Sequence, residues 1–287
     1  MTAPSTGTLR VHGATLHYDV RGQGPLLLLI PGGAGGAASF DGIADDLAAE
    51  YTVATYDPRG MSRSTLDDPE AEQRVAEHAD DALRLLERLT PGEPARVFGV
   101  SSGAIVALHL LSAHPERVER VVAHEPPVVE VLPDAVEHRA FLAHVQETFR
   151  AEGLMPAMAV FAAGLRKDEA EAAAEPRREA ESEIELPPQA AARREQTMAN
   201  LPYFVGRIVP RFMSYTPDVQ RLQTEALADR LVLAGGQDSR GELPYRPAAF
   251  LAERFGTDLV HFPGGHTGLT THPAEFGALL RKVLCTA

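Results

Sequence analysis

Short runs of apolar residues alternate along the chain with longer segments in which apolar residues recur every three or four positions. The short runs have the length and continuity of strands covered on both faces: Pro25–Ile30, Tyr51–Asp57, Ala95–Val100 and Glu119–His124. The longer segments between them have helical periodicity: Asp41–Glu50, Glu72–Leu89 and Ser102–Ala113. This alternation predicts an α/β fold with a mostly parallel sheet and helices on both faces.

Two regions depart from this alternation. The chain opens with two strand-like stretches, 7–13 and 14–22, with Gly13 in the turn of a predicted hairpin. From Pro127 to Pro217 the pattern is helical and charged, and the alternation then resumes with strands expected near 230–236 and 257–262. We therefore predict an α/β core in two parts, 1–126 and 218–287, interrupted by a helical cap over 127–217. Within it, segment 166–183 is strongly charged and reads as an exposed helix or linker.

Composition narrows the class of protein. The 287 residues suit one large α/β domain with an insertion, and 27 basic against 40 acidic residues give a formal net charge of −13. This balance argues against nucleic acid or an anionic membrane as partner. With Cys285 as its single cysteine, the chain has no intrachain disulfide and no zinc site of several thiolates. The first 13 residues lack a basic head and an apolar run, so we expect a cytoplasmic protein.

The stretch Val97–Leu110 contains two adjacent serines between an apolar run and a helical segment. A Gly-x-Ser-x-Gly pattern fits only when Gly99 and Gly103 flank Ser101. A nucleophile on a sharp strand-to-helix turn has no room for side chains two residues away on either side. Ser101 is therefore the predicted nucleophile. Ser102 would offer its backbone N–H to an oxyanion at the start of the helix.

A serine nucleophile needs a base and an acid that orients the base. His266 lies just beyond a predicted strand and between glycine-rich residues, so it is the predicted base. Asp238 also follows a strand and gives the chain order Ser, Asp, His, so we favour it as the acid. Glu125 ends another strand and is the alternative acid. We assign three other histidines to structural or surface roles: His109, His261 and His272.

The glycine-rich loop after the strand Pro25–Ile30 is the predicted source of a second oxyanion donor. Its glycines would let backbone amides approach a substrate closely. Gly33 is the first choice for this donor and Ala34 the second.

These motifs resemble the α/β-hydrolase fold family, in its serine hydrolase branch with a helical cap. The resemblance covers nearly the whole chain, including the run Asp57-x-Arg59-Gly60-x-x-x-Ser64, which in this family supports the core. It implies an eight-stranded sheet with a cap after the sixth strand. In one departure from the family, Pro31-Gly32 replaces the His-Gly that many members have before the oxyanion donor.

The resemblance implies hydrolysis of an ester, thioester, lactone or related acyl bond of a small molecule through a Ser-His-Asp triad, with no metal or organic cofactor. C–C bond hydrolases and perhydrolase-type enzymes on this fold are alternatives, as is a ligand-binding receptor without turnover. Either a monomer or a homodimer fits the family. Eight apolar cap residues are candidates for a pocket, although packing within the cap is the expected role of most: Phe141, Phe149, Met155, Met158, Phe161, Phe204, Phe212 and Met213.

Overall fold

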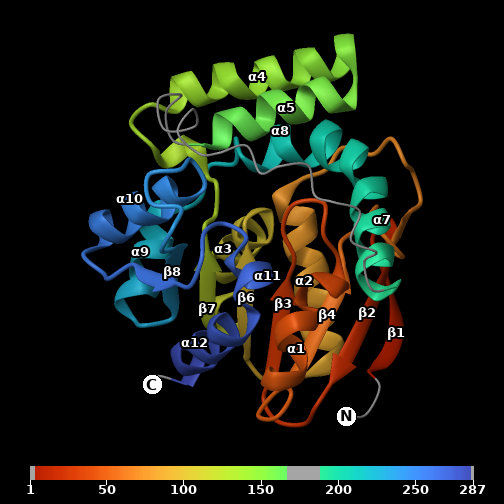
Figure 1. Cartoon of the computed structure of the whole chain (residues 1–287). Helices are drawn as coiled ribbons and strands as arrows, with labels where there is room; N and C mark the ends of the chain where they lie inside the picture. Colours follow the sequence, from red (N-terminus) through yellow and green to blue (C-terminus); the bar gives the residue numbers. More distant parts are fainter. Residues whose placement is uncertain (1–3, 167–187, 286–287) are drawn as a thin grey trace.

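The computed structural model describes residues 4–166 and 188–285. Its strands follow the predicted runs closely (Figure 1). They are β1 (Ser5–Val11), β2 (Ala14–Arg21), β3 (Leu26–Ile30), β4 (Thr52–Asp57), β5 (Thr65–Leu66), β6 (Ala95–Val100), β7 (Val118–His124), β8 (Leu231–Gly236) and β9 (Val260–Phe262). All five residues of β3 are leucine or isoleucine and all are buried, because both faces of this strand are covered.

All nine strands form one sheet. Eight of them lie in the order β1-β2-β4-β3-β6-β7-β8-β9, and the two-residue β5 pairs with β2 outside this path. The β1–β2 hairpin is antiparallel and turns at Gly13, which has a φ of 72°. Along the part of the sheet ordered β4-β3-β6-β7-β8-β9, every neighbouring pair of strands is parallel. The predicted mostly parallel α/β sheet is therefore confirmed, with the short β5 as an addition to the eight expected strands.

Helices cover both faces of this sheet. One face packs against α1 (Asp41–Leu47) and α12 (Pro273–Cys285), which contribute to the same buried cluster as Phe98 and Phe262. The larger cluster on the opposite face includes residues of α2 (Val75–Leu89), α3 (Ser102–Ala113), α9 (Val219–Leu227) and α10 (Tyr245–Phe255). The predicted alternation thus gives three layers, with the sheet between two layers of helix.

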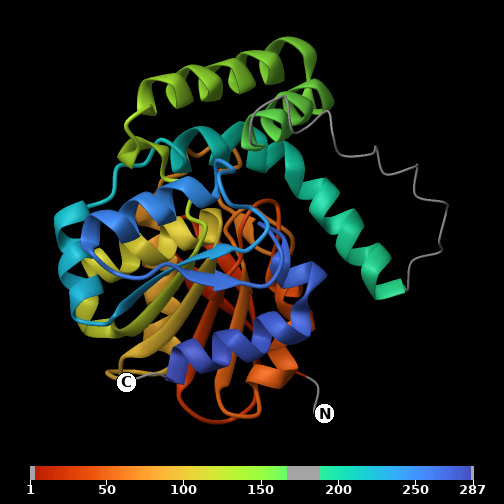
Figure 2. The same cartoon turned by 60° about the vertical axis from the view of Figure 1, so that its left-hand side comes forward.

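Within the predicted insertion, 127–217, the described residues are largely helical. Its described elements are η3 (Val129–Val131), α4 (Ala135–Glu152), α5 (Leu154–Leu165), α7 (Pro188–Tyr203), the π-helical turn η4 (Phe204–Ile208) and α8 (Val209–Phe212). In Figures 1 and 2, α4, α5 and α8 lie across one end of the sheet, away from both termini, and α7 descends from them along one side of the molecule. Most of the charged segment 166–183 lies outside the described residues.

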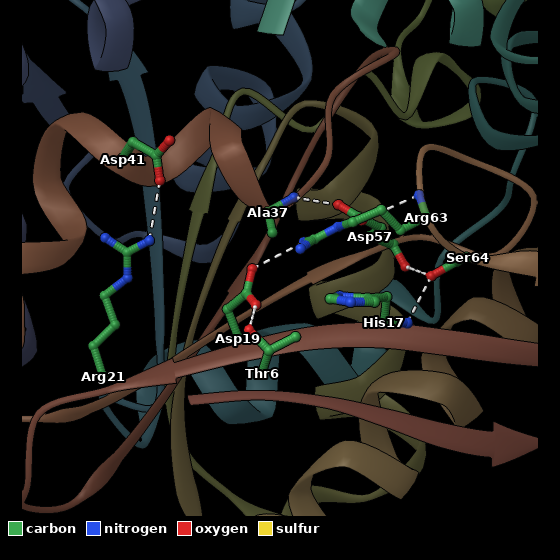
Figure 3. Close-up of polar contacts among 9 residues, drawn as sticks. All are labelled: Thr6, His17, Asp19, Arg21, Ala37, Asp41, Asp57, Arg63 and Ser64. Atoms are coloured by element: carbon green, nitrogen blue, oxygen red, sulfur yellow. Dashed lines mark hydrogen bonds and ion pairs between the residues drawn. The ribbon is translucent and has the colours of Figure 1, made fainter. Parts of the chain in front are cut away.

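Side-chain hydrogen bonds hold the loop after β4 to the core. Arg59 donates two hydrogen bonds to the buried carboxylate of Asp81, at 2.7 and 2.6 Å. Ser64 Oγ donates to the Asp57 carbonyl at 2.6 Å (Figure 3). These contacts agree with the supporting role that the family resemblance implied for this run. Among the described residues, no helix is long and apolar enough to cross a membrane.

Candidate active site

Ser101 lies at the sharp turn between β6 and α3. Its backbone has φ 54° and ψ −123°, a conformation that L-residues seldom adopt and that is found where function maintains strain. A Cβ on Gly99 would lie 2.5 Å from the Gly103 carbonyl oxygen, and one on Gly103 would lie 2.3 Å from the Ile30 carbonyl oxygen. Both positions therefore require glycine, for the steric reason that singled out Ser101 in the sequence.

His266 faces the same cavity as Ser101, and its other side is held by Glu125. His266 Nδ1 and Glu125 Oε2 are 2.5 Å apart, and both Ser101 and His266 line the cavity. In the described part of the chain no hydrogen bond joins the Ser101 hydroxyl to His266. Such contacts are often long before substrate binds. The His266 imidazole therefore contacts a carboxylate through Nδ1, and its other side faces the cavity that Ser101 also lines.

Glu125 is fully buried and its carboxylate is surrounded by donors. The Gly236 N–H donates to Oε1 at 2.7 Å, and the Ser239 hydroxyl donates to the same oxygen. Burial alone would raise the pKa of Glu125, but hydrogen bonds from His266 and Ser239 and the charge of His266 bring that pKa below its ordinary value. Glu125 is thus an ionised partner for a histidine that accepts a proton.

Within the described residues, Asp238, the acid that the sequence favoured, makes no hydrogen bond with His266, and the alternative acid Glu125 occupies that place. Asp238 is exposed, and its backbone N–H donates to the Gly264 carbonyl at 3.0 Å, while its neighbour Ser239 is buried against Glu125. The loop after β8 therefore turns position 239, and not 238, toward Glu125. Glu125 is placed by a positive φ of 49° at the end of β7 and by the pairing of β7 with β8.

Gly33 and Ser102 lie together at the cavity, beside Ser101. The Gly33 N–H donates to Ser102 Oγ at 3.0 Å, and Gly33 has a φ of 59°. A Cβ on Gly32 would lie 2.2 Å from the Val100 carbonyl oxygen, so the glycine-rich loop is pressed against the turn that carries Ser101. Ala34, the second candidate, is buried and does not line the cavity. The first choice of oxyanion donor is thus the one that reaches the site.

The three histidines assigned to other roles make contacts that fit such roles. His109 Nδ1 lies 2.7 Å from the Tyr215 hydroxyl, and His261 Nε2 lies 2.9 Å from the Tyr245 hydroxyl. His272 Nδ1 lies 2.8 Å from Thr271 Oγ1. None of the three lines the cavity that holds Ser101. Within the described residues, no three His, Cys, Asp or Glu side chains are grouped as a metal site requires.

The cavity above Ser101 has a volume of about 300 Å³ and a predominantly apolar wall. Four of the eight apolar residues singled out in the insertion line it: Phe161, Phe204, Phe212 and Met213. The other four pack elsewhere or are exposed, as Met155 is. Sequence reasoning missed Leu165, Ile208 and Val209, which also line the wall. No Asp, Glu, Lys or Arg among the described residues lines it.

The chain belongs to the α/β-hydrolase fold family, whose model matches residues 25–239. It is 38% identical over 283 residues to the uncharacterized hydrolase YraK of Bacillus subtilis, covering 98% of this chain and 96% of that protein. A zearalenone hydrolase of Bionectria ochroleuca is 35% identical over 119 residues, or 40% of this chain and 45% of that protein.

Solved structures share the fold. The enol-lactonase from Burkholderia xenovorans superposes with a TM-score of 0.69 at 18% identity, over 98% of this chain and 100% of that chain. This similarity supports the α/β-hydrolase fold of the chain.

Proposed function

We propose that the protein is a serine hydrolase that cleaves an uncharged carboxylic ester or lactone of a small molecule through an acyl-enzyme intermediate. One arrangement carries the proposal: Ser101 sits on a strained turn in the same cavity as His266, and a buried, ionised Glu125 holds the far side of that histidine. These are the parts that serine hydrolysis needs. Hydrolase relatives such as YraK support the assignment.

In the first half of the proposed mechanism, Ser101 Oγ attacks the carbonyl carbon while His266 takes the hydroxyl proton. The carbonyl oxygen becomes an oxyanion next to the N–H groups of Ser102 and Gly33, at the start of α3. For Gly33 this requires the Ser102 hydroxyl, which its N–H now binds, to rotate aside. The Glu125 carboxylate stabilises the imidazolium by its charge and holds the Nδ1 proton in place.

The tetrahedral intermediate then collapses, and His266 gives its proton to the leaving alcohol. In the second half, His266 takes a proton from water as the water oxygen attacks the acyl carbon. The second tetrahedral intermediate then collapses, and His266 returns that proton to Ser101 Oγ as the acid leaves. With a lactone, the alcohol stays tethered to the acyl group, and the product leaves as one hydroxy acid. Every proton in this cycle passes through His266.

The cavity wall favours an uncharged, apolar substrate. Aromatic and aliphatic side chains of the insertion face Ser101, and no Asp, Glu, Lys or Arg of the described residues lines the wall. Burying a charge there would cost free energy with nothing to offset it. A bulky charged thioester carrier therefore fits poorly, whereas esters and lactones with apolar groups fit the wall. We propose that the insertion acts as the cap that supplies this specificity.

The first test is hydrolysis of p-nitrophenyl acetate and butyrate by the wild type and by Ser101→Ala. We expect the substitution to lower kcat by about 10⁴-fold or more, because the covalent step is lost. Ser102→Ala is the matched control, since it keeps its backbone N–H, and its kcat should stay within about tenfold of wild type.

A fluorophosphonate label read by intact mass makes the test independent of the chosen ester. Wild type should gain one label and Ser101→Ala none, with both variants showing the same thermal midpoint. A wild type that is folded but neither turns over esters nor takes the label would refute the proposed function. Equal rates for wild type and Ser101→Ala would refute the assignment of the nucleophile.

A further inference from the structure

Asn200 is a buried polar residue on α7 that joins the helical insertion to the loop carrying Gly33. Its Nδ2 donates to the Ala34 carbonyl at 2.8 Å and to Ser62 Oγ at 2.9 Å. Its Oδ1 accepts from the Ser62 N–H, also at 2.9 Å. Only 6% of the residue is exposed. One side chain of the insertion thus holds two loops of the core.

The orientation of this amide is fixed by its partners. The Ala34 carbonyl can only accept a hydrogen bond, and the Ser62 N–H can only donate one, so Nδ2 and Oδ1 cannot exchange places. Ser62 itself has a φ of 53°, which is unusual for a serine. Loss of the amide would leave buried polar groups unpaired in both loops, which is costly.

The loop of residues 32–37 is held by the core at its two ends. At the first end, the Gly33 N–H donates to Ser102 Oγ of the core. Within the loop itself, the Gly35 N–H donates to the Gly32 carbonyl at 3.0 Å. At the other end, the Ala37 N–H donates to Asp57 Oδ1 at 2.8 Å (Figure 3). Between these ends, among the described residues, the insertion's hydrogen bond to this loop is the one from Asn200 to the Ala34 carbonyl. The insertion therefore reaches the loop one residue from the proposed oxyanion donor.

We propose that Asn200 is a positioning residue that makes the geometry of the oxyanion hole depend on the seating of α7. The inference rests on the proposed function, because it assumes that Gly33 binds the oxyanion. Through the Ala34 carbonyl, the Asn200 amide holds the loop that carries Gly33, whose N–H can turn to the reacting carbonyl once the Ser102 hydroxyl rotates aside. A displacement of α7 would shift that N–H, and misplacement by about 1 Å costs about a hundredfold in rate.

The test compares Asn200→Asp and Asn200→Ala with wild type. Asn200→Asp is nearly the same size but sets a carboxylate oxygen against the Ala34 carbonyl, so the two oxygens repel. Gln196→Ala is the matched control, since Gln196 lies one turn earlier on α7 and makes no hydrogen bond within the described residues. Rates are expressed per active site, counted by the fluorophosphonate label.

We expect both Asn200 variants to lower kcat by about tenfold to a hundredfold, with KM within about threefold of wild type. A trifluoromethyl ketone, which adds the serine and leaves an oxyanion in the hole, should bind more weakly by the same factor as kcat falls. Gln196→Ala should match wild type in both measurements.

Two results would overturn the inference. If kcat per labelled site and ketone affinity are unchanged while the thermal midpoint falls, Asn200 has only a structural role. If KM rises and kcat is constant, Asn200 acts on substrate binding. A wild type that takes no label would instead refute the proposed function, and this inference with it.

Discussion

The ends of β7 and β8 lie side by side in the sheet, and each is followed by an acidic residue, yet only one of the two reaches the site. Glu125 after β7 is buried and bound to His266, whereas Asp238 after β8 is exposed. The buried position next to Asp238 belongs to Ser239, which donates to the Glu125 carboxylate. The comparison shows that neighbouring strand ends can share one task, with one supplying the carboxylate and the other its hydrogen-bond donors.

The largest expected effect comes from Glu125→Gln. The amide keeps the size of the side chain but lacks the charge that stabilises the imidazolium, and it can hold the ring in the wrong tautomer. We expect kcat/KM for p-nitrophenyl butyrate to fall by about 10³- to 10⁴-fold. The measurement is steady-state kinetics on protein whose fold is confirmed by circular dichroism. A loss below about threefold would mean that His266 takes its orientation from another group.

An intermediate effect is expected from Ser239→Ala. The Ser239 hydrogen bond helps to hold the pKa of Glu125 below its ordinary value, so its removal raises that pKa. Glu125 must be ionised to act, and it is protonated as the pH falls through its pKa. A higher pKa of Glu125 therefore makes the loss of kcat/KM relative to wild type grow as the pH falls, which moves the acid side of the profile to higher pH. At neutral pH we expect kcat/KM to fall by about tenfold, which corresponds to the free energy of about one hydrogen bond.

The pH profile separates this role from a general loss of structure. A variant that merely unfolds in part would lower kcat/KM by one factor at every pH and leave the midpoint of the acid limb in place. Ser239→Thr, which keeps the hydroxyl, should restore the wild-type midpoint. If Ser239→Ala leaves the acid limb unmoved, the loop after β8 does not tune Glu125.

The smallest effect is expected from Asp238→Asn. The side chain is exposed and its backbone contact to Gly264 does not depend on the carboxylate. We expect kcat/KM to stay within about twofold of wild type, as for most exposed substitutions. A loss comparable to that of Glu125→Gln would reverse the comparison and restore Asp238 as the acid.

The parts of this site that the sequence predicted correctly depend on neighbours along the chain. The strand, Gly99, Ser101, Gly103 and the helix lie within a few residues of one another, and the crowding at the turn can be judged from residue sizes. The mostly parallel sheet with helices on both faces follows similarly from the alternation of buried runs and helices. Such features need no knowledge of distant contacts.

The acid could not be decided in this way because it depends on contacts between distant segments. Glu125 and His266 are 141 positions apart, and Glu125 and Ser239 are 114 apart. Both acids follow buried strands, and chain order alone favoured Asp238. The burial of Glu125 between β7 and β8 and its contact with His266 appear only once the strands are paired. Which apolar residues of the insertion line the cavity likewise depends on contacts between distant segments.

The Ser101 N–H donates to the carbonyl of His124, the residue just before Glu125. The proposed nucleophile is therefore fastened to the last residue of β7, and the proposed acid is the next residue, within one continuous piece of chain that ends before the insertion begins. Of Ser101, Glu125 and His266, only His266 follows the insertion in the chain. A recombinant exchange of residues 127–217 for the equivalent segment of another family member would leave the spacing of Ser101 and Glu125 untouched. Such an exchange would therefore vary the groups that line the cavity while keeping the spacing of Ser101 and Glu125, but it would also replace Asn200 and its contacts to the Ala34 carbonyl and Ser62.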